Sequence, residues 1–215
     1  MPGGKVSNEI DRSRRLMVTL LIEFGIKDKR ILSAMGKINR HLFIPQQLRN
    51  ICNPYGNYPC PIGYGQTISQ PYIVAYMTER LGIRKGEKVL EVGTGSGYQA
   101  AIISELGADV TSLEIIKELA EHARNILIEE GYKGVKVVNS SGYIGYPENA
   151  PYDAIIVTCA PPDIPDNLIK ELKEGGRMII PVGRFSQKLL FLIKVKGKIM
   201  ISEEMNVRFV PMVKK

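Results

Sequence analysis

The feature that most constrains the fold is a regular alternation of short apolar runs and helical segments between residues 88 and 181. The apolar runs are rich in Val, Ile and Leu, which is typical of buried strands. The predicted strands cover residues 88–92, 109–113, 135–138, 152–158 and 177–181. The predicted helices cover residues 96–106, 116–130 and 166–173, the last one ended by Gly175 and Gly176. Strands that alternate with helices through short loops predict a doubly wound, mostly parallel α/β sheet.

The N-terminal flank predicts helices and one long loop. Apolar residues at helical spacing indicate an amphipathic helix over residues 7–24, and Asp28 is placed to cap a second, short helix. Residues 39–71 are rich in Pro, Gly, Asn and Tyr and predict a long structured loop. Pro71 opens a third helix, which Gly82 ends.

The C-terminal flank predicts antiparallel strands. Two β-type runs at residues 188–194 and 198–202, with a turn at Gly197, indicate a hairpin that closes the edge of the sheet. No linker or internal repeat interrupts the chain, so we expect one domain over residues 1–215. Its parts are N-terminal helices with a loop (1–82), a sheet core (83–183) and C-terminal strands (184–215).

The formal charge of +7 is unevenly distributed. Residues 1–50 contain ten Lys and Arg against four Asp and Glu, and residues 184–215 contain eight against two. Residues 51–183 between them contain eleven against sixteen. Basic ends around an acidic centre fit an acidic substrate or nucleic acid, and they fit ordinary solvated surface charge as well. The charge alone does not distinguish an anionic peptide from RNA.

Cysteine and histidine content gives no sign of a metal site. Cys52, Cys60 and Cys159 lack metal-ligand spacing, and His41 and His122 lie far apart in the sequence. Cys52 and Cys60 share one loop and could pair there, but we expect free thiols in a reducing compartment. No apolar stretch approaches the roughly 20 residues that span a bilayer, and the polar N-terminus lacks a signal-peptide pattern. These features predict a cytoplasmic protein without a membrane partner, and they do not set an oligomeric state.

The strongest motif is a glycine-rich loop that follows the first strand of the core and opens a helix. It runs Glu91-Val92-Gly93-Thr94-Gly95-Ser96-Gly97, and its glycines allow a tight turn and a close approach of ligand to main chain. The third glycine comes one residue too early for a dinucleotide loop. Glu91 would repel a pyrophosphate, whereas it suits the cationic ammonium of a methionine moiety.

A second carboxylate supports an adenosine ligand. Glu114 ends the next strand, where a carboxylate can accept hydrogen bonds from both ribose hydroxyls. The alternative is a simple strand–helix turn with two surface acids, in which Thr94 and Ser96 cap the helix. After the third strand, residues 139–143 occupy the usual position of groups that hold an adenine ring. The fourth strand leads to Cys159, which we expect to be a packing thiol near the site.

Several segments together resemble the protein-L-isoaspartate O-methyltransferase family. The segments are PIGYGQTISQP at residues 61–71, EVGTGSGY at 91–98, PYDAI at 151–155, LKEGGR at 172–177 and VRFVPM at 207–212. The glycine loop is shared by many methyltransferases, whereas residues 66–69 and 207–212 are more specific to this family. The chain departs from the family pattern at Tyr72, where His is common, and at Ser140-Ser141-Gly142, where Gly-Asp-Gly is common. The second departure puts the usual adenine-amino contact in doubt, and Ser141 or a backbone carbonyl could replace it.

The resemblance implies a Rossmann-like methyltransferase fold and S-adenosyl-L-methionine as cofactor, with S-adenosyl-L-homocysteine as product. It implies cofactor contacts from these residues: Gln66, Ile68, Glu91, Gly93, Thr94, Gly95, Ser96, Gly97, Glu114, Ser141, Gly142 and Tyr143. It implies substrate contacts from Ile62, Val207, Phe209, Val210 and Pro211, with Thr67 and Ser69 at the reaction centre. Its substrates are isoaspartyl-containing proteins and peptides, and we expect no nucleic-acid partner.

The implied reaction suits a chain with few histidines. The acceptor is the free carboxylate of an L-isoaspartyl residue, which is ionised at neutral pH and requires no general base. Thr67 and Ser69 would orient it through hydroxyl or backbone N–H groups, and Ser69 fits equally as a cap of the helix at Pro71. Residues 207–211 suit strand addition to a peptide main chain, or a core-facing strand. The alternative functions are an RNA methyltransferase, which the basic ends favour, and an inactive cofactor-binding module.

Overall fold

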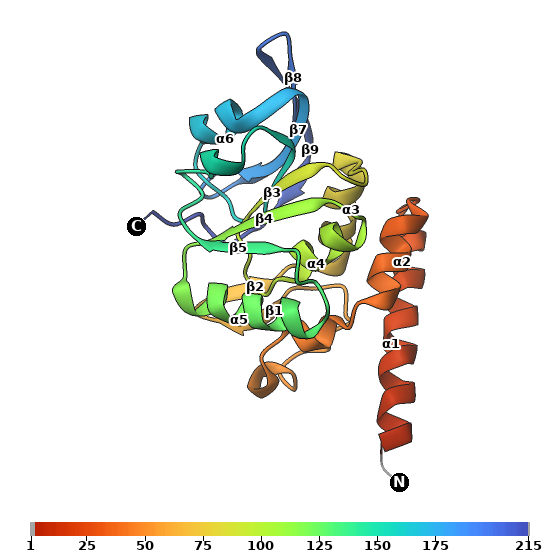
Figure 1. Ribbon diagram of the computed structural model, residues 1–215. Coiled ribbons are helices and arrows are strands. Elements are labelled where there is room, and N and C mark those ends of the chain that lie inside the picture. Colours follow the sequence, from red (N-terminus) through yellow and green to blue (C-terminus); the bar gives the residue numbers. More distant parts are fainter. Residues whose placement is uncertain (1–2, 215) are drawn as a thin grey trace.

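The structure is a computed structural model that describes residues 3–214, with side chains from residue 8 onward. Its centre is one seven-stranded sheet (Figure 1). The strand order is β5-β4-β3-β6-β7-β8-β9. Its strands are β3 (Lys88–Val92), β4 (Asp109–Glu114), β5 (Lys136–Asn139), β6 (Tyr152–Val157), β7 (Leu172–Val182), β8 (Gln187–Val195) and β9 (Lys198–Val207). The strands from β5 to β7 are parallel, and β8 and β9 continue the sheet antiparallel. The predicted doubly wound sheet with a C-terminal hairpin is confirmed.

Six α-helices accompany the sheet in the described part of the chain (Figure 1). They are α1 (Gly3–Glu23), α2 (Lys29–Lys37), α3 (Pro71–Leu81), α4 (Tyr98–Glu105), α5 (Lys117–Glu129) and α6 (Asp166–Glu171). The predicted cap of α2 is present, since the Asp28 side chain accepts from the backbone N–H of Arg30. No helix among the described residues is long and apolar enough to cross a membrane.

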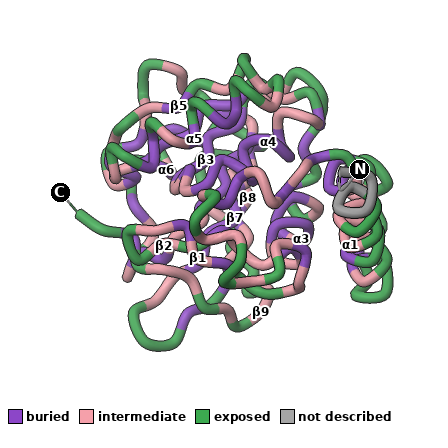
Figure 2. Tube along the Cα trace, turned by 90° about the horizontal axis from the view of Figure 1, so that it is seen from below, coloured by how far each residue is buried: buried purple, intermediate pink, exposed green. Residues whose placement is uncertain are grey.

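Alternating side chains of the strands pack into two apolar layers, one on each face of the sheet. In β3, Val89 belongs to the larger layer, which also takes side chains from α1 to α5. The next residue, Leu90, belongs to the smaller layer, together with Leu168 of α6 and Met212 of the C-terminal tail. Figure 2 shows the buried central strands enclosed by exposed loops and helix faces. This double burial explains why the parallel strands read as continuous apolar runs.

The predicted long loop contains a hairpin that the sequence analysis missed. Strands β1 (Cys60–Gly63) and β2 (Gln66–Ile68) pair antiparallel, and short 3-10 turns η1 (Arg40–Phe43) and η2 (Gln46–Leu48) precede them. Tyr64 and Gly65 both have positive φ, the backbone of a tight two-residue hairpin turn. Gly63-Tyr64-Gly65 was therefore an available turn signal. The strands were missed because both are short and β1 contains Pro61.

Two further predictions were wrong. The Gly175-Gly176 pair does not end α6; it lies within β7, where the pairing with β6 skips from Leu172 to Arg177. A bulge with Gly175 at a φ of 76° accommodates the extra residues. Cys52 and Cys60 form a disulfide, where free thiols were expected. The pairing is possible because the loop between them returns to the start of β1.

Candidate active site

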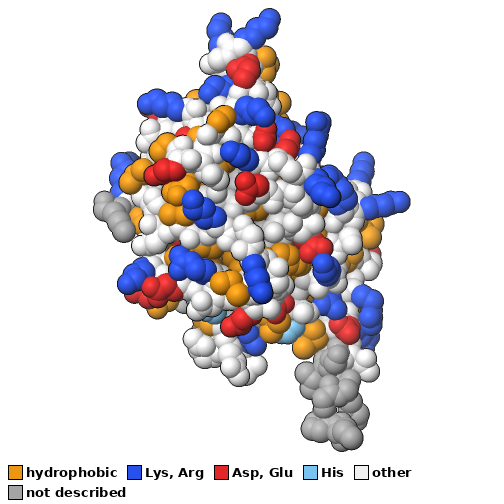
Figure 3. Space-filling view, in the orientation of Figure 1, with side chains coloured by type: hydrophobic (Ala, Val, Ile, Leu, Met, Phe, Trp, Pro, Cys, Tyr) orange, Lys and Arg blue, Asp and Glu red, His pale blue; other side chains and the backbone are white. Residues whose placement is uncertain are grey.

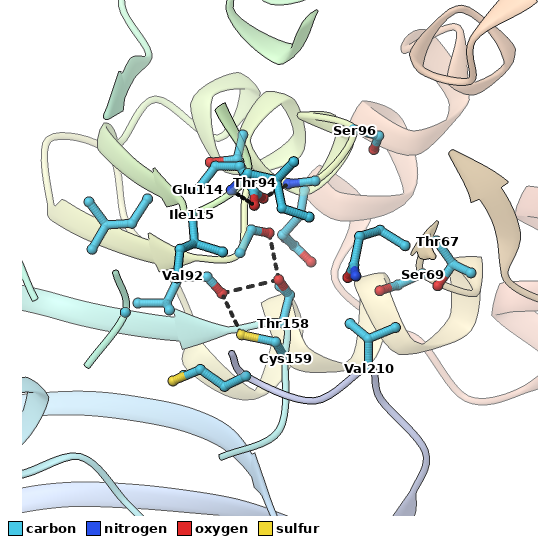
Figure 4. Close-up of a pocket in the computed structure, with 18 of the residues that line it drawn as sticks. Thr67, Ser69, Val92, Thr94, Ser96, Glu114, Ile115, Thr158, Cys159 and Val210 are labelled. Carbon is cyan, nitrogen blue, oxygen red and sulfur yellow. Dashed lines mark hydrogen bonds between the residues drawn. The ribbon is translucent and has the colours of Figure 1, made fainter. Parts of the chain in front are cut away.

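Two cavities open at the carboxyl ends of β3, β4 and β6, the edge where open parallel sheets bind ligands. The first, here the loop cavity, is lined by the glycine loop, the end of β4, residues 66–69 and the C-terminal tail (Figure 4). The second, here the tail groove, is lined by Pro59, Thr67, Ser69, Gln70, Ile73, Thr158 and residues 206–211. One cavity thus lies against the glycine loop and the other against the tail, as a site for two reactants requires.

Five residues line both cavities and mark the junction between them. They are Thr67, Ser69, Thr158, Val210 and Pro211. Figure 4 shows Thr67, Ser69 and Val210 on one side of the loop cavity, with Glu114 and Ile115 on the other. Both residues predicted at the reaction centre, Thr67 and Ser69, therefore lie where the two cavities meet. Among the described residues neither Ser69 nor Gln70 caps α3 through its side chain, so the predicted capping role of Ser69 is not observed.

The glycine loop needs its glycines for both conformation and space. Gly93, Gly95 and Gly97 have φ values of 100°, 52° and 86°. A Cβ on Gly93 would lie 2.4 Å from the Thr158 hydroxyl oxygen, and one on Gly97 would lie 3.3 Å from the Leu127 side chain of α5. The Thr158 hydroxyl donates to the Gly93 carbonyl at 2.6 Å. The end of β6 thus holds the loop in place at the junction of the cavities.

Glu114 lies at the wall of the loop cavity as predicted and is held from behind. Its two carboxylate oxygens accept from the backbone N–H groups of Gly95 at 2.8 Å and Ile116 at 2.9 Å. A carboxylate can accept about four hydrogen bonds, so one lone pair on each oxygen stays available. That arrangement fits the two hydroxyls of a ribose.

Glu91 lies behind the loop and not at the cavity wall. Its side chain is fully buried, accepts from the Ser112 hydroxyl, and leaves Oε1 without a partner among the described residues. Thr94 bonds the same Ser112 hydroxyl at 2.5 Å, and so it does not cap α4. Burial raises the pKa of Glu91 to about 8, and the nearby Glu114 charge adds to the rise. Glu91 is therefore connected to the glycine loop through the Ser112 and Thr94 side chains, and it does not reach the loop cavity itself.

The segment after β5 reaches the loop cavity through its backbone more than through its side chains. Ser140 and Gly142 line the cavity, and a Cβ on Gly142 would lie 2.3 Å from Val92. Ser141 is buried, and its hydroxyl accepts from the Tyr143 backbone N–H at 3.4 Å. Tyr143 points to the tail and donates to the Met212 carbonyl at 3.4 Å. Ser141 is therefore not placed at the cavity wall as a replacement for the usual Asp.

Four other predicted residues lie close by in different roles. Gln66 and Ile68 line the loop cavity, and Ser96, also in its wall, accepts from the Tyr98 backbone N–H at 3.2 Å. Ile62 is buried beneath Gly95 and lines neither cavity.

The predicted substrate residues Val207, Phe209, Val210 and Pro211 line the tail groove. Gln187 bonds both main-chain groups of Phe209, through its Oε1 at 2.6 Å and its Nε2 at 3.1 Å. Ala160 pairs with Val210 and Met212, each at 2.8 Å. Few main-chain groups of this segment are left for strand addition, so its side chains are the better candidates for substrate contact.

Cys159 lines the loop cavity, and burial raises the pKa of its thiol to about 12. The thiol therefore stays protonated at neutral pH and is a poor nucleophile. Tyr72 packs edge-on against Phe24 and lines neither cavity, so its departure from the family pattern does not alter their walls. Thr158 and Arg208 are lining residues that the sequence analysis did not select. Thr158 is the last residue of the predicted fourth strand and directly follows β6 in the structure, and that position at a strand end was the available signal.

Comparison with known proteins agrees with this geometry. The family model described as protein-L-isoaspartate(D-aspartate) O-methyltransferase matches residues 12–215. A protein-L-isoaspartate O-methyltransferase of Methanoculleus marisnigri is 50% identical over 204 residues, which cover 94% of this chain and 92% of that protein. One from Dictyoglomus thermophilum is 48% identical over 205 residues, covering 95% of this chain and 92% of that protein.

A solved structure with the same name, from Plasmodium falciparum in complex with S-adenosyl-L-homocysteine, superposes with a TM-score of 0.83. It is 25% identical and covers 94% of this chain and 99% of that chain. These matches extend over nearly the whole sequence. The chain belongs to the protein-L-isoaspartate O-methyltransferase family.

Proposed function

We propose that the chain transfers a methyl group from S-adenosyl-L-methionine to the free α-carboxylate of L-isoaspartyl residues in damaged proteins. The neighbouring backbone amide nitrogen then attacks the ester carbonyl carbon, and methanol leaves as a succinimide forms without the enzyme. Hydrolysis of the succinimide restores some normal aspartate. The observation that carries the proposal is the junction of Thr67, Ser69 and Thr158, where a ligand cavity and a peptide-sized groove meet.

The loop cavity fits S-adenosyl-L-methionine by its own chemistry. Glu114 offers free lone pairs for a diol, and the backbone at Gly142 borders the cavity without a side chain. When bound, the cofactor supplies an electrophilic methyl group. The residues that would hold it are the glycine loop, Glu114 and the backbone of residues 140–142, with Gln66 and Ile68 on the substrate side.

The contribution of the protein is binding, orientation and the exclusion of water. The Thr67 and Ser69 hydroxyls are free of partners among the described residues, so they can donate to the carboxylate and point one oxygen toward the loop cavity. No proton has to be removed from an ionised carboxylate. Among the described residues no histidine lines either cavity, and this reaction requires none.

The tail groove fits a peptide better than a nucleotide base. Its walls carry Phe209, Val207 and Ile73, and the end of β6 lacks the amide and aromatic pair that would clamp a flipped base. On the face drawn in Figure 3, lysine and arginine side chains are spread among acidic ones and form no single stripe. A cytoplasmic location and the absence of a nucleic-acid partner stay predictions from the sequence.

The test is methyl transfer with radiolabelled S-adenosyl-L-methionine. Paired peptides contain either L-isoaspartate or normal aspartate at one position, and bulk RNA is incubated in parallel. We expect base-labile label on the isoaspartyl peptide only. Label in RNA would support the alternative methyltransferase, and cofactor binding without transfer would support an inactive module. Ser69→Ala should lower kcat/KM for the isoaspartyl peptide and leave the fold intact.

A further inference from the structure

Arg40 is a fully buried cation that bridges three segments of the chain, two of which line the candidate active site. It lies in η1, and its side chain is 0% exposed. Its Nη2 donates to the Ser69 carbonyl at 2.8 Å, and its Nε donates to the Pro54 carbonyl at 2.7 Å. Its guanidinium carbon lies 5.0 Å from the centre of the ring of Tyr98, the residue that directly follows the glycine loop. One side chain thus connects the substrate-side segment, the disulfide loop and the start of α4.

This charge is held without an acid. Among the described residues no carboxylate pairs with Arg40, and its Nη1 has no hydrogen-bond partner. Burial lowers the pKa of Arg40 to about 10, so the group stays protonated at neutral pH. A buried, unpaired charge is costly, and a neutral side chain of similar size would often stabilise the fold at least as well. Fold stability is therefore a weak explanation for Arg40.

The contact with Ser69 offers a better explanation. The Ser69 carbonyl is fixed toward Arg40, and the following peptide bond is trans, so the Gln70 N–H points away from Arg40. This fixes the backbone that carries the Ser69 hydroxyl at the junction of the cavities. The same positive charge is fully buried behind Ser69, where it favours an anion near that residue.

We propose that Arg40 is a positioning residue for methyl transfer: it fixes the Ser69 backbone so that the Ser69 hydroxyl meets the substrate carboxylate. Arg40 touches neither reactant and acts through Ser69. The proposal rests on the proposed function. It explains why a cation is buried where no acid accompanies it.

The test uses Arg40→Lys. Lysine keeps the positive charge but lacks the planar guanidinium group that donates to the Ser69 and Pro54 carbonyls together. Arg49→Lys is the matched control, because Arg49 also donates to two carbonyls, of Ile44 at 2.8 Å and Leu42 at 3.3 Å, and lines neither cavity. We expect Arg40→Lys to lower kcat/KM for the isoaspartyl peptide about tenfold or more, with the affinity for S-adenosyl-L-homocysteine within about threefold. Arg49→Lys should lower the Tm without this loss. Arg40→Met is measured as a second variant, since the desolvation of a buried lysine charge could unfold Arg40→Lys. Arg40→Met carries no charge to desolvate and should show the same loss of kcat/KM.

A double-mutant cycle tests the route through Ser69. If Arg40 acts by placing the Ser69 hydroxyl, Arg40→Lys should add less than about twofold to the loss already caused by Ser69→Ala. Additive losses, or equal losses from Arg40→Lys and Arg49→Lys, would overturn the proposal. A wild-type chain inactive on the isoaspartyl peptide would refute the proposed function. An active wild type with Arg40 variants at wild-type efficiency would refute the role of Arg40 alone.

Discussion

Glu91→Gln should make the stability of the protein less dependent on pH. Glu91 is fully buried, has Ser112 as its one hydrogen-bond donor among the described residues, and has a pKa of about 8 against 4.5 for an exposed glutamate. The folded state therefore keeps the proton across a pH range in which the unfolded chain has lost it. A carboxyl group with a raised pKa in the folded state contributes stability that is complete below pH 4.5 and lost as the pH rises through 8.

The size of the effect follows from the same two pKa values. One pH unit between them corresponds to about 1.4 kcal/mol, so the full loss is on the order of 5 kcal/mol and the loss at pH 7 is on the order of 3 kcal/mol. Glutamine is neutral at every pH and has nearly the same shape. The glutamine amide group would lack hydrogen-bond partners at the position that Oε1 of Glu91 occupies. The resulting cost in unfolding free energy does not change with pH.

The assay is urea unfolding of the wild type and Glu91→Gln at pH 5 and pH 8.5, without cofactor. We expect the difference in unfolding free energy between the two proteins to shift in favour of the variant by several kcal/mol from pH 5 to pH 8.5. Ser112→Ala removes the bond that favours the charged form of Glu91, so it should raise the pKa of Glu91 further and enlarge the loss of stability between pH 5 and pH 8.5. If the difference in unfolding free energy between the wild type and Glu91→Gln is the same at pH 5 and pH 8.5, the reasoning about Glu91 is refuted.

Three further predictions address the loop, the disulfide and the sheet edge. Gly93→Ala would place a Cβ 2.4 Å from the Thr158 hydroxyl oxygen at a residue with a φ of 100°. It should weaken S-adenosyl-L-homocysteine binding, measured by calorimetry, by roughly tenfold or more, and an unchanged affinity would contradict the requirement for glycine at this position. Reduction of Cys52–Cys60, a closed loop with a sequence separation of 8, should lower the free energy of unfolding by roughly 2–3 kcal/mol, which urea titration with and without dithiothreitol measures. Arg80 lowers the pKa of Glu204 to about 2, so the stability from this pair is present above pH 4.5 and lost as the pH falls through 2. Glu204→Gln should therefore cost about 1–2 kcal/mol at pH 7 and progressively less toward pH 2, and an equal cost at both pH values would exclude the pair as its source.

The parallel core could be predicted because each element carries its own pattern. Four of its strands, β3 to β6, lie within one residue of the predicted bounds, since buried runs of Val, Ile and Leu end at glycines and polar residues. The glycine loop and Glu114 followed from their positions at the ends of β3 and β4. Local periodicity and strand-end chemistry were enough for this half of the site.

The other half depends on contacts between distant residues, and local patterns do not contain these. Arg40 and Ser69 are 29 residues apart, and Thr158 and Gly93 are 65 apart. An arginine in a loop-rich segment resembles a surface charge until the fold encloses it. Glu91 shows the converse: the sequence predicted a cofactor contact, whereas its buried side chain lies behind the loop and is linked to Thr94 through Ser112.

The charges of the two cavities explain how a site without histidine can drive this reaction. Among the described lining residues, Glu114 is the charged group of the loop cavity and Arg208 that of the tail groove. Each cavity therefore favours a reactant of opposite charge: a cationic methyl donor in the first and a carboxylate in the second. The junction between them holds only neutral groups, Thr67, Ser69 and Thr158 among them. Methyl transfer from a cation to an anion cancels both charges, so a junction poor in charge stabilises the transition state relative to the separated ions. The protein thus needs two cavities that attract the reactants by charge and a neutral junction that orients them. A general base at the junction would have no proton to remove.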